Sequence, residues 1–221
     1  MVDALPSGST EPRIRGYICD GFARFIQSRI GTEMLGAHLR QRLEPAFVES
    51  LDFGREGLGF LPSAWYRADH VHRLLDASLD GLSPETKLRF AGQAGRSVFA
   101  RQIGGLQKAL FSMLLTPDRY ARHIPKAWRH NFGSGTIAIE SGEGWHRSTY
   151  TGWREYHPLV SRAMMVGKLE AYRAMGLDDA RVYVERCDPE LGSVSVVYWG
   201  PRSEYEPVTP TDQLRPPQES T

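Results

Sequence analysis

Two segments decide the fold of this chain: Gly16-Tyr-Ile-Cys-Asp-Gly-Phe-Ala-Arg-Phe-Ile26, which leads to Gly31-Thr-Glu-Met34, and the later Tyr150-Thr-Gly-Trp-Arg154. We interpret the first as a strand that runs into a helix. The second is predicted to be a turn that a helix and a hairpin follow. The hydrophobic pattern between these landmarks completes the architecture.

Up to about residue 131 the hydrophobic period is that of helices. Leu35, Leu39 and Leu43 repeat every four residues, as expected when a helix buries one stripe. A second stripe has i, i+3, i+4 spacing and consists of Ala68, Val71, Leu74, Leu75 and Leu79. The aromatic pair Trp65 and Tyr66 is predicted at the start of this second helix.

Two tripeptides, Ser83-Pro84-Glu85 and Thr116-Pro117-Asp118, are predicted to start helices. In each, a hydroxyl can cap free amides, proline has no amide to cap, and the carboxylate favours the positive end of the helix dipole. We expect these helices to end near Arg101 and His130. Gly104-Gly105 separates the first from an apolar helix that reaches Leu115, and Gly92-x-x-Gly95 is interpreted as a site of close helix packing.

After Asn131 the period falls to two, which is typical of strands. Ile137 and Ile139 alternate with small or polar residues, and a turn at 141–144 returns the chain as a strand over 145–151. Pro158 opens a helix to about Met175. A second hairpin is predicted from Val182, Val184, Val194, Val196 and Tyr198. Helices followed by an antiparallel sheet place the chain in the α+β class, with an N-terminal helical layer packed on a C-terminal sheet.

This order of elements resembles the haem-NO-binding (H-NOX) superfamily, which includes vinyl-reductase-type ligand domains and transport-particle subunits. The resemblance covers about residues 14 to 200 and rests on the opening segment through Glu33 and on Gly152 to Gly167. The chain also resembles a large myxobacterial paralogous family of about this length. That likeness is carried by Leu114-Leu-Thr-Pro117, Pro125-Lys-Ala-Trp-Arg129 with Asn131-Phe132, and Tyr198-Trp199, and it implies shape rather than chemistry.

Length, composition and charge limit the possible domain organisation and the cellular compartment of the protein. With 221 residues, 41% of them hydrophobic, the chain is expected to form one domain over 13–200 between tails at 1–12 and 201–221. A net charge of +1 with mixed signs disfavours nucleic acid, and no apolar run is long enough to span a membrane. We expect a cytoplasmic protein, with Cys19 and Cys187 as core residues.

The resemblance implies a haem site that this sequence has altered. Haem domains of the superfamily use Tyr-x-Ser-x-Arg for the propionates, and Tyr150-x-Gly152-x-Arg154 keeps its outer residues. Ala121 stands where the iron-binding histidine is expected, with His123 two residues on. We therefore expect that haem has been lost and that no metal is held. In the alternative of a haem-based NO or O₂ sensor, His123 ligates iron and Tyr150 and Arg154 contact the propionates.

No catalytic constellation is visible, so we expect a non-enzymatic signalling or regulatory domain. It is predicted to bind an apolar small molecule or a protein partner, and a homodimer is a further expectation. A ligand-free interaction scaffold is the other alternative. Large rings near the first hairpin suit either a core or a ligand pocket. The predicted ligand-binding or partner-binding residues are Trp128, Tyr150, Trp153, Arg154, Tyr156 and His157.

Overall fold

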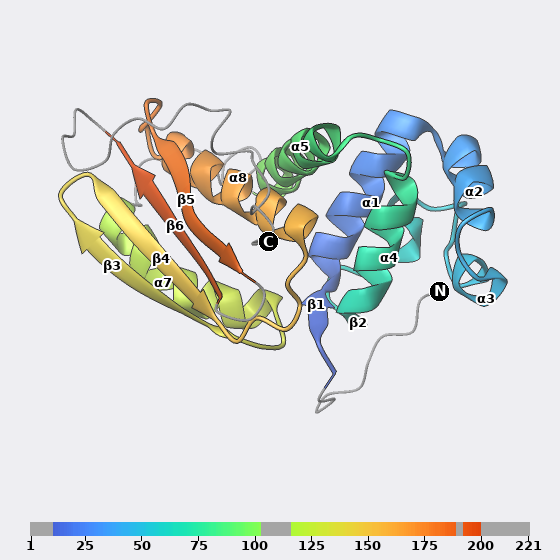
Figure 1. Ribbon diagram of the computed structural model, residues 1–221, viewed down its shortest axis with the longest axis horizontal. Helices are drawn as coiled ribbons and strands as arrows, with labels where there is room; N and C mark the ends of the chain where they lie inside the picture. The colour runs from blue at the N-terminus through green and yellow to red at the C-terminus, as the bar shows by residue number, and fades with distance from the viewer. Residues whose placement is uncertain (1–10, 103–115, 189–191, 200–221) are drawn as a thin grey trace, which may run out of the picture.

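The computed structural model describes residues 11–102, 116–188 and 192–199. Figure 1 places a group of helices from the first part of the chain beside a sheet from the last part, with α8 between the sheet and α5. This arrangement is the predicted α+β class. The expected tails, the Gly104-Gly105 break and the helix to Leu115 lie outside the described residues, except for the last two residues of the N-terminal tail.

The helical group is built from short amphipathic elements. Their bounds are α1 Gly16–Ile30, α2 Thr32–Arg40, α3 Pro45–Glu49 and α4 Ala68–Ser78. The predicted leucine stripe of α2 and the whole i, i+3, i+4 stripe of α4 are buried, apart from Leu43, which is partly buried. Both stripes meet one core with the apolar face of α1, which includes Cys19, as predicted.

A small two-stranded sheet opens this half of the molecule. β1 (Arg13–Arg15) pairs antiparallel with β2 (Trp65–Arg67), with Ile14 opposite Tyr66. The prediction of a helix start at Trp65 and Tyr66 was therefore wrong, since the helix begins only at Ala68. Pairing with β1, which is distant in sequence, decides the conformation of Trp65, Tyr66 and Arg67. A local sequence pattern carries no information about that pairing.

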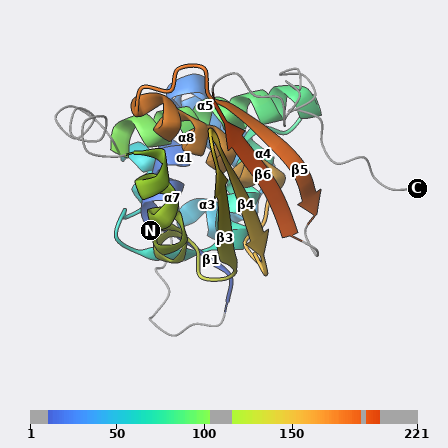
Figure 2. The ribbon, with the colours of Figure 1, turned by 90° about the vertical axis from the view of Figure 1, so that its left-hand side faces the viewer.

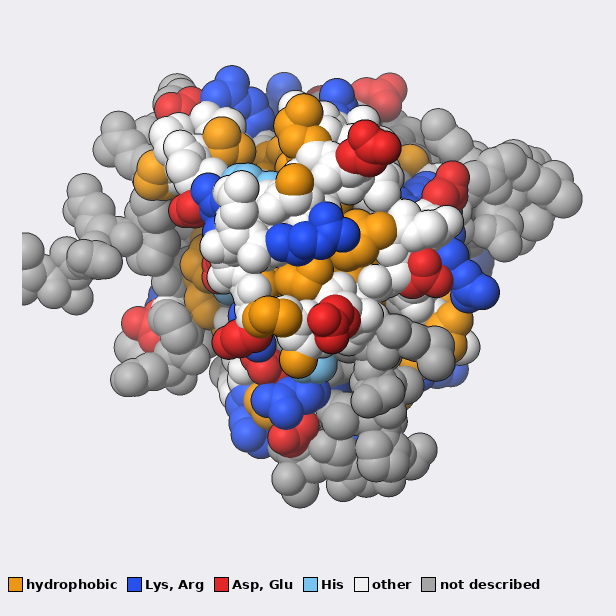
Figure 3. Space-filling view, turned by 90° about the vertical axis from the view of Figure 1, so that its right-hand side faces the viewer, with side chains coloured by type: hydrophobic (Ala, Val, Ile, Leu, Met, Phe, Trp, Pro, Cys, Tyr) orange, Lys and Arg blue, Asp and Glu red, His pale blue; other side chains and the backbone are white. Residues whose placement is uncertain are grey.

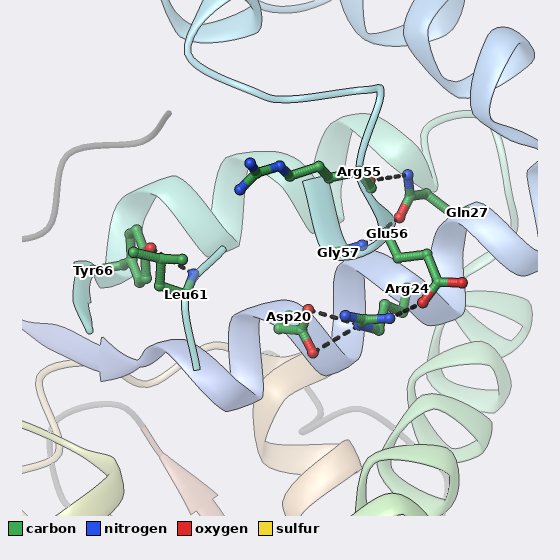
Figure 4. Close-up of polar contacts among 8 residues, drawn as sticks. All are labelled: Asp20, Arg24, Gln27, Arg55, Glu56, Gly57, Leu61 and Tyr66. Carbon is green, nitrogen blue, oxygen red and sulfur yellow. Dashed lines mark hydrogen bonds and ion pairs between the residues drawn. The ribbon is translucent and has the colours of Figure 1, made fainter. Parts of the chain in front are cut away.

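The loop between α3 and β2 is fixed onto α1. It contains the short 3₁₀ segment η1 (Glu56–Gly59), and Gly57, Leu58 and Gly59 all have positive φ. Figure 4 shows Gln27 bridging this loop, where its amide accepts from the Gly57 N–H at 2.7 Å and donates to the Arg55 carbonyl at 3.1 Å. The left-handed Leu58 is fully buried, so core packing offsets its backbone strain.

The two halves meet where α5 (Pro84–Gln102) crosses α8 (Pro158–Ala174). A Cβ added at Gly95 would lie 2.1 Å from the Ala163 carbonyl oxygen, so only glycine allows this close approach. The interpretation of Gly92-x-x-Gly95 as a packing site is confirmed. The Ser83 hydroxyl accepts a hydrogen bond from the Thr86 N–H, which agrees with the predicted start of α5.

The larger sheet has the order β3-β4-β6-β5, antiparallel throughout. Its strands are β3 Thr136–Gly142, β4 Trp145–Thr151, β5 Arg181–Asp188 and β6 Gly192–Tyr198, so both predicted hairpins are confirmed. Figure 2 shows α7 (Pro117–Asn131) alongside β3. Thr116 caps α7 by accepting from the Arg119 N–H, which confirms the predicted helix start.

The face formed by α2 and α3 carries charges of both signs among scattered hydrophobic side chains (Figure 3). Ion pairs link neighbouring elements there, such as Arg42 with Asp80 at 2.8 Å and Arg73 with Glu44. Over the described ranges, none of the helices has the length and apolar character that crossing a membrane requires.

Candidate ligand-binding site

A pocket of about 600 Å³ lies between the helices and the larger sheet. Its described walls come from α1, α5, α7, α8, β3 and β4, so both halves of the chain contribute. The walls are mainly apolar, with side chains such as Phe22, Val98, Ile124, Ile137 and Met164. A volume of this size within mainly apolar walls is typical of small-molecule sites.

Two of the six predicted site residues, Trp128 and Tyr150, line this pocket. Trp128 comes from the buried face of α7, and its indole N–H donates to the Ser134 carbonyl at 3.1 Å. Tyr150 comes from β4, and burial raises its pKa to about 12, although hydrogen bonds to Ser195 and Ser148 oppose that shift. Both rings are held in place by polar contacts at their edges.

Trp153 lies in the core behind the pocket wall and is 5% exposed. Its ring makes edge contacts with Trp128 at 4.9 Å, Phe132 at 5.3 Å and Tyr156 at 5.5 Å between centroids. The predicted gathering of aromatics is therefore present, except that Trp145 stands at the far end of the β3–β4 hairpin, opposite Gly142. Trp153 is not among the pocket-lining residues, and its burial leaves little surface for a partner.

The remaining three predicted residues lie in the turn from β4 to α8. Arg154 is exposed, and its backbone N–H donates to the Ser134 hydroxyl at 2.8 Å. Tyr156 and His157 are half-buried. The His157 ring caps α8 by accepting from the Leu159 N–H, lies 3.2 Å from the Asp76 carboxylate, and stacks on His72. These residues do not reach the pocket.

A buried carboxylate that the sequence reasoning missed holds this turn. Glu155 is fully buried, accepts from the Arg13 N–H at 3.0 Å and accepts from the Ser134 hydroxyl. Its backbone carbonyl lies 3.2 Å from the His72 ring nitrogen. Burial, with the nearby His157, lowers the pKa of His72 to about 4. The turn that leads into α8 is thus anchored to β1 and α4.

His123 does not have the position of an iron ligand. On α7 the buried side chains are Ala121, Ile124 and Trp128, whereas His123 is exposed at the open side of the pocket. A residue two places after Ala121 is rotated by about 200° around a helix, and the structure agrees with that rotation. The buried position that the resemblance assigns to the iron ligand therefore holds Ala121, which has no metal-binding atom.

Lys168 is a buried charged residue of the pocket that the sequence reasoning missed. It lies on α8, is 7% exposed, and donates to the Ser148 hydroxyl at 2.7 Å and the Ser195 hydroxyl at 3.1 Å. The Tyr150 ring centroid is 5.9 Å from its Nζ. Burial lowers the pKa of Lys168 to about 7, because the apolar surroundings disfavour the ammonium. The signal in the sequence is a single charge inside the apolar run 163–169.

A second buried polar group ties α7 to the sheet. His146 of β4 is fully buried, with Nε2 3.1 Å from an Asp118 oxygen and Nδ1 2.7 Å from the Tyr172 hydroxyl. Burial lowers the pKa of His146 despite the Asp118 carboxylate. In the neutral ring, Nε2–H donates to Asp118 and Nδ1 accepts from Tyr172, so all three groups are satisfied. This chain of contacts connects the first turn of α7 with β4 and α8.

The reactive chemistry available to the described residues is limited. Cys19 is buried, and burial raises the pKa of its thiol, which disfavours the nucleophilic thiolate. In the part of the chain that the structure describes, no three histidine, cysteine or carboxylate side chains gather as a metal site would require. Cys187 lies in β5, but its side chain is outside the description.

Comparison with solved structures identifies a similar fold. The sequence matches no protein-family model. It matches no curated protein. Among solved structures, the Fe(II) unliganded H-NOX protein from K. algicida is similar over 87% of this chain and all of that chain, with a TM-score of 0.59 and 13% identity. The chain has an H-NOX-like fold.

Two further structures agree with this H-NOX-like fold. A mutant of the K. algicida protein has a TM-score of 0.61 at 12% identity and covers 85% of this chain and 97% of that chain. The H-NOX from Shewanella woodyi in the Fe(II)CO ligation state has a TM-score of 0.55 at 15% identity, over 87% and 98%. The predicted resemblance to the H-NOX superfamily is confirmed at the level of fold, while the myxobacterial likeness stays a prediction.

Proposed function

We propose that this protein is a non-enzymatic, cytoplasmic sensor domain that binds an apolar small molecule in the pocket between its helices and its sheet. The observation that carries the proposal is the 600 Å³ pocket, with apolar walls from both halves of the chain. Burying an apolar ligand there would remove its surface from water and link the two halves. The similarity to ligand-bound H-NOX structures supports the sensor class.

The proposed signal is a change in the packing of α7. This helix presents Ile124 and Trp128 to the pocket, so a ligand contacts it directly. Its outer side exposes Arg122 and Arg129, and residues 119–131 contain no acidic residue. A ligand that favours one packing of α7 would shift the population of the conformation that an acidic partner reads.

A substitution that fills the pocket with a larger side chain tests the proposal. Met164 lines the pocket, and Met175 is also partly buried but lies outside it. Apolar compounds that raise the melting temperature of the wild type are expected to lose that effect in Met164→Trp and to keep it in Met175→Trp. A ligand at a hundred times its Kd adds about 2.7 kcal/mol. The proposal fails if no apolar compound stabilises the wild type, or if both variants respond equally.

A haem-based gas sensor is the second candidate, favoured by Tyr150 and Arg154 in the spacing of the propionate motif and by the fold. The exposed position of His123 opposes it. Absorption spectra after haem reconstitution decide between the two. The candidate requires a Soret band that His123→Ala abolishes, whereas the leading proposal expects no stoichiometric band.

A partner surface is proposed at the turn that carries Arg154, Tyr156 and His157, because Arg154 is exposed, Tyr156 and His157 are half-buried, and none of them lines the pocket. A homodimer through this turn is one version of that proposal. Light scattering after size exclusion would give the mass of two chains, and Tyr156→Ala would halve it. A monomeric mass at all concentrations excludes the dimer and leaves a different partner or a scaffold role.

A further inference from the structure

Lys168 is the most unusual polar group of the pocket, because it is a lysine placed almost out of reach of water. Only 7% of Lys168 is exposed to solvent, and the pocket wall around it is mainly apolar. Lysine is almost never buried unless it is paired with an opposite charge. Within the described ranges, no carboxylate oxygen lies within 4.0 Å of its Nζ. The nearest described partners are hydroxyls.

The donors of Lys168 leave room for another acceptor. An ammonium has three N–H donors, and the Ser148 and Ser195 hydroxyls accept two of them, at 2.7 and 3.1 Å. On the same side, Nζ faces the ring of Tyr150, which lines the pocket. One donor of a buried cation is therefore available at the pocket wall.

The open side of the pocket has the same sign of charge. Lys126, His123 and His130 line the pocket and are exposed, so they stand where a ligand arrives from solvent. The Lys126 ammonium at this opening raises the local concentration of anions. Both Lys126 at the open side of the pocket and Lys168 inside it thus favour a negatively charged ligand.

We propose that the ligand is an apolar monocarboxylate, whose hydrocarbon part fills the pocket and whose carboxylate accepts a hydrogen bond from Lys168 Nζ. This inference rests on the proposed ligand-binding function and adds the chemical class. A carboxylate supplies the counter-charge that the described surroundings of Lys168 lack, and hydrogen bonds between two ionised groups are stronger than those between neutral ones. The apolar walls then select against small polar anions.

The experiment compares two probes of equal chain length, dodecanoate and 1-dodecanol, by calorimetric titration of the full chain below their aggregation limits. Wild type is expected to bind dodecanoate at least about tenfold more tightly than the alcohol, since only the carboxylate meets the ammonium. Lys168→Met is expected to remove that preference and to leave the affinity for the alcohol within about twofold. Lys87→Met is the matched control, because Lys87 lies on α5 but does not line the pocket, and it should keep the preference.

The outcomes separate this inference from the proposed function. Equal affinity of the wild type for both probes, or an unchanged preference in Lys168→Met, overturns carboxylate recognition and leaves apolar binding in place. If neither probe nor any other apolar compound binds, both proposals fail. Should Lys168→Met not fold, the comparison of dodecanoate, dodecanol and dodecyltrimethylammonium on the wild type still decides. Tighter binding of the cation than of the carboxylate contradicts the inference.

Discussion

Lys168 determines the chemistry of the pocket at the scale of single residues. Its ammonium is held by two serine hydroxyls from β4 and β6, 20 and 27 residues away along the chain. Whether a lysine of α8 is buried depends on which face the helix lays on the sheet. That orientation is a tertiary property, so the sequence alone predicted the helix but not the role of this residue.

Burial of Lys168 predicts a pH-dependent stability. Its pKa falls from 10.5 to about 7 on folding, so between those values the unfolded chain binds more protons and stability rises with pH. The expected slope is up to about 1.4 kcal/mol per pH unit. Urea unfolding between pH 7 and 9.5 should show this slope in wild type and in Lys126→Met, but not in Lys168→Met.

The comparison with the variant isolates Lys168 from its titratable neighbours. Titratable groups that line the same pocket are Tyr17, Tyr120, His123, Lys126, His130 and Tyr150, and His146 is a further neighbour. Burial raises the pKa values of Tyr17, Tyr120 and Tyr150 above this pH range. All of these groups are present both in the wild type and in Lys168→Met, so a difference between the two slopes comes from Lys168. Equal slopes in wild type and Lys168→Met would contradict the burial of a shifted lysine.

At the scale of elements, the crossing of α5 and α8 sets the pocket, because both helices line it. Gly95→Ala places a Cβ against the Ala163 carbonyl, so we expect a loss of at least about 2 kcal/mol of unfolding free energy. Gly92→Ala is the matched control, since its nearest contact is a Val166 side-chain atom at 3.3 Å. Its effect should stay within about 1 kcal/mol. Chemical denaturation measures both, and equal effects would refute the close crossing.

The elements were predictable where a local signal exists. The Thr116 and Ser83 caps, the stripe of α4 and the alternation at Ile137 and Ile139 each encode one element, and all are confirmed. β2 was not predictable in this way, because Trp65 becomes a strand only through its pairing with Arg15. Trp153 illustrates the same limit: its polar neighbours suggested a surface, yet the stacking of Trp128 on Phe132 encloses it.

At the scale of the molecule, the H-NOX-like fold brings helices from the first half against a sheet from the second. The pocket lies at that junction, so a ligand there contacts α1, α5, α7 and α8 together with β3 and β4. The Asp118–His146–Tyr172 contacts hold one end of α7, while its other end faces the pocket through Trp128.

The most direct test of the central proposal is an NMR measurement on methyl-labelled protein with dodecanoate. We expect intermolecular nuclear Overhauser effects from the hydrocarbon chain to the methyl groups of Ile124, Ile137 and Met164, which line the pocket. Leu82, an exposed side chain that does not line the pocket, should give none. Contacts confined to exposed methyl groups such as those of Leu82, or no contacts at a saturating concentration, would contradict a ligand-binding pocket at this junction.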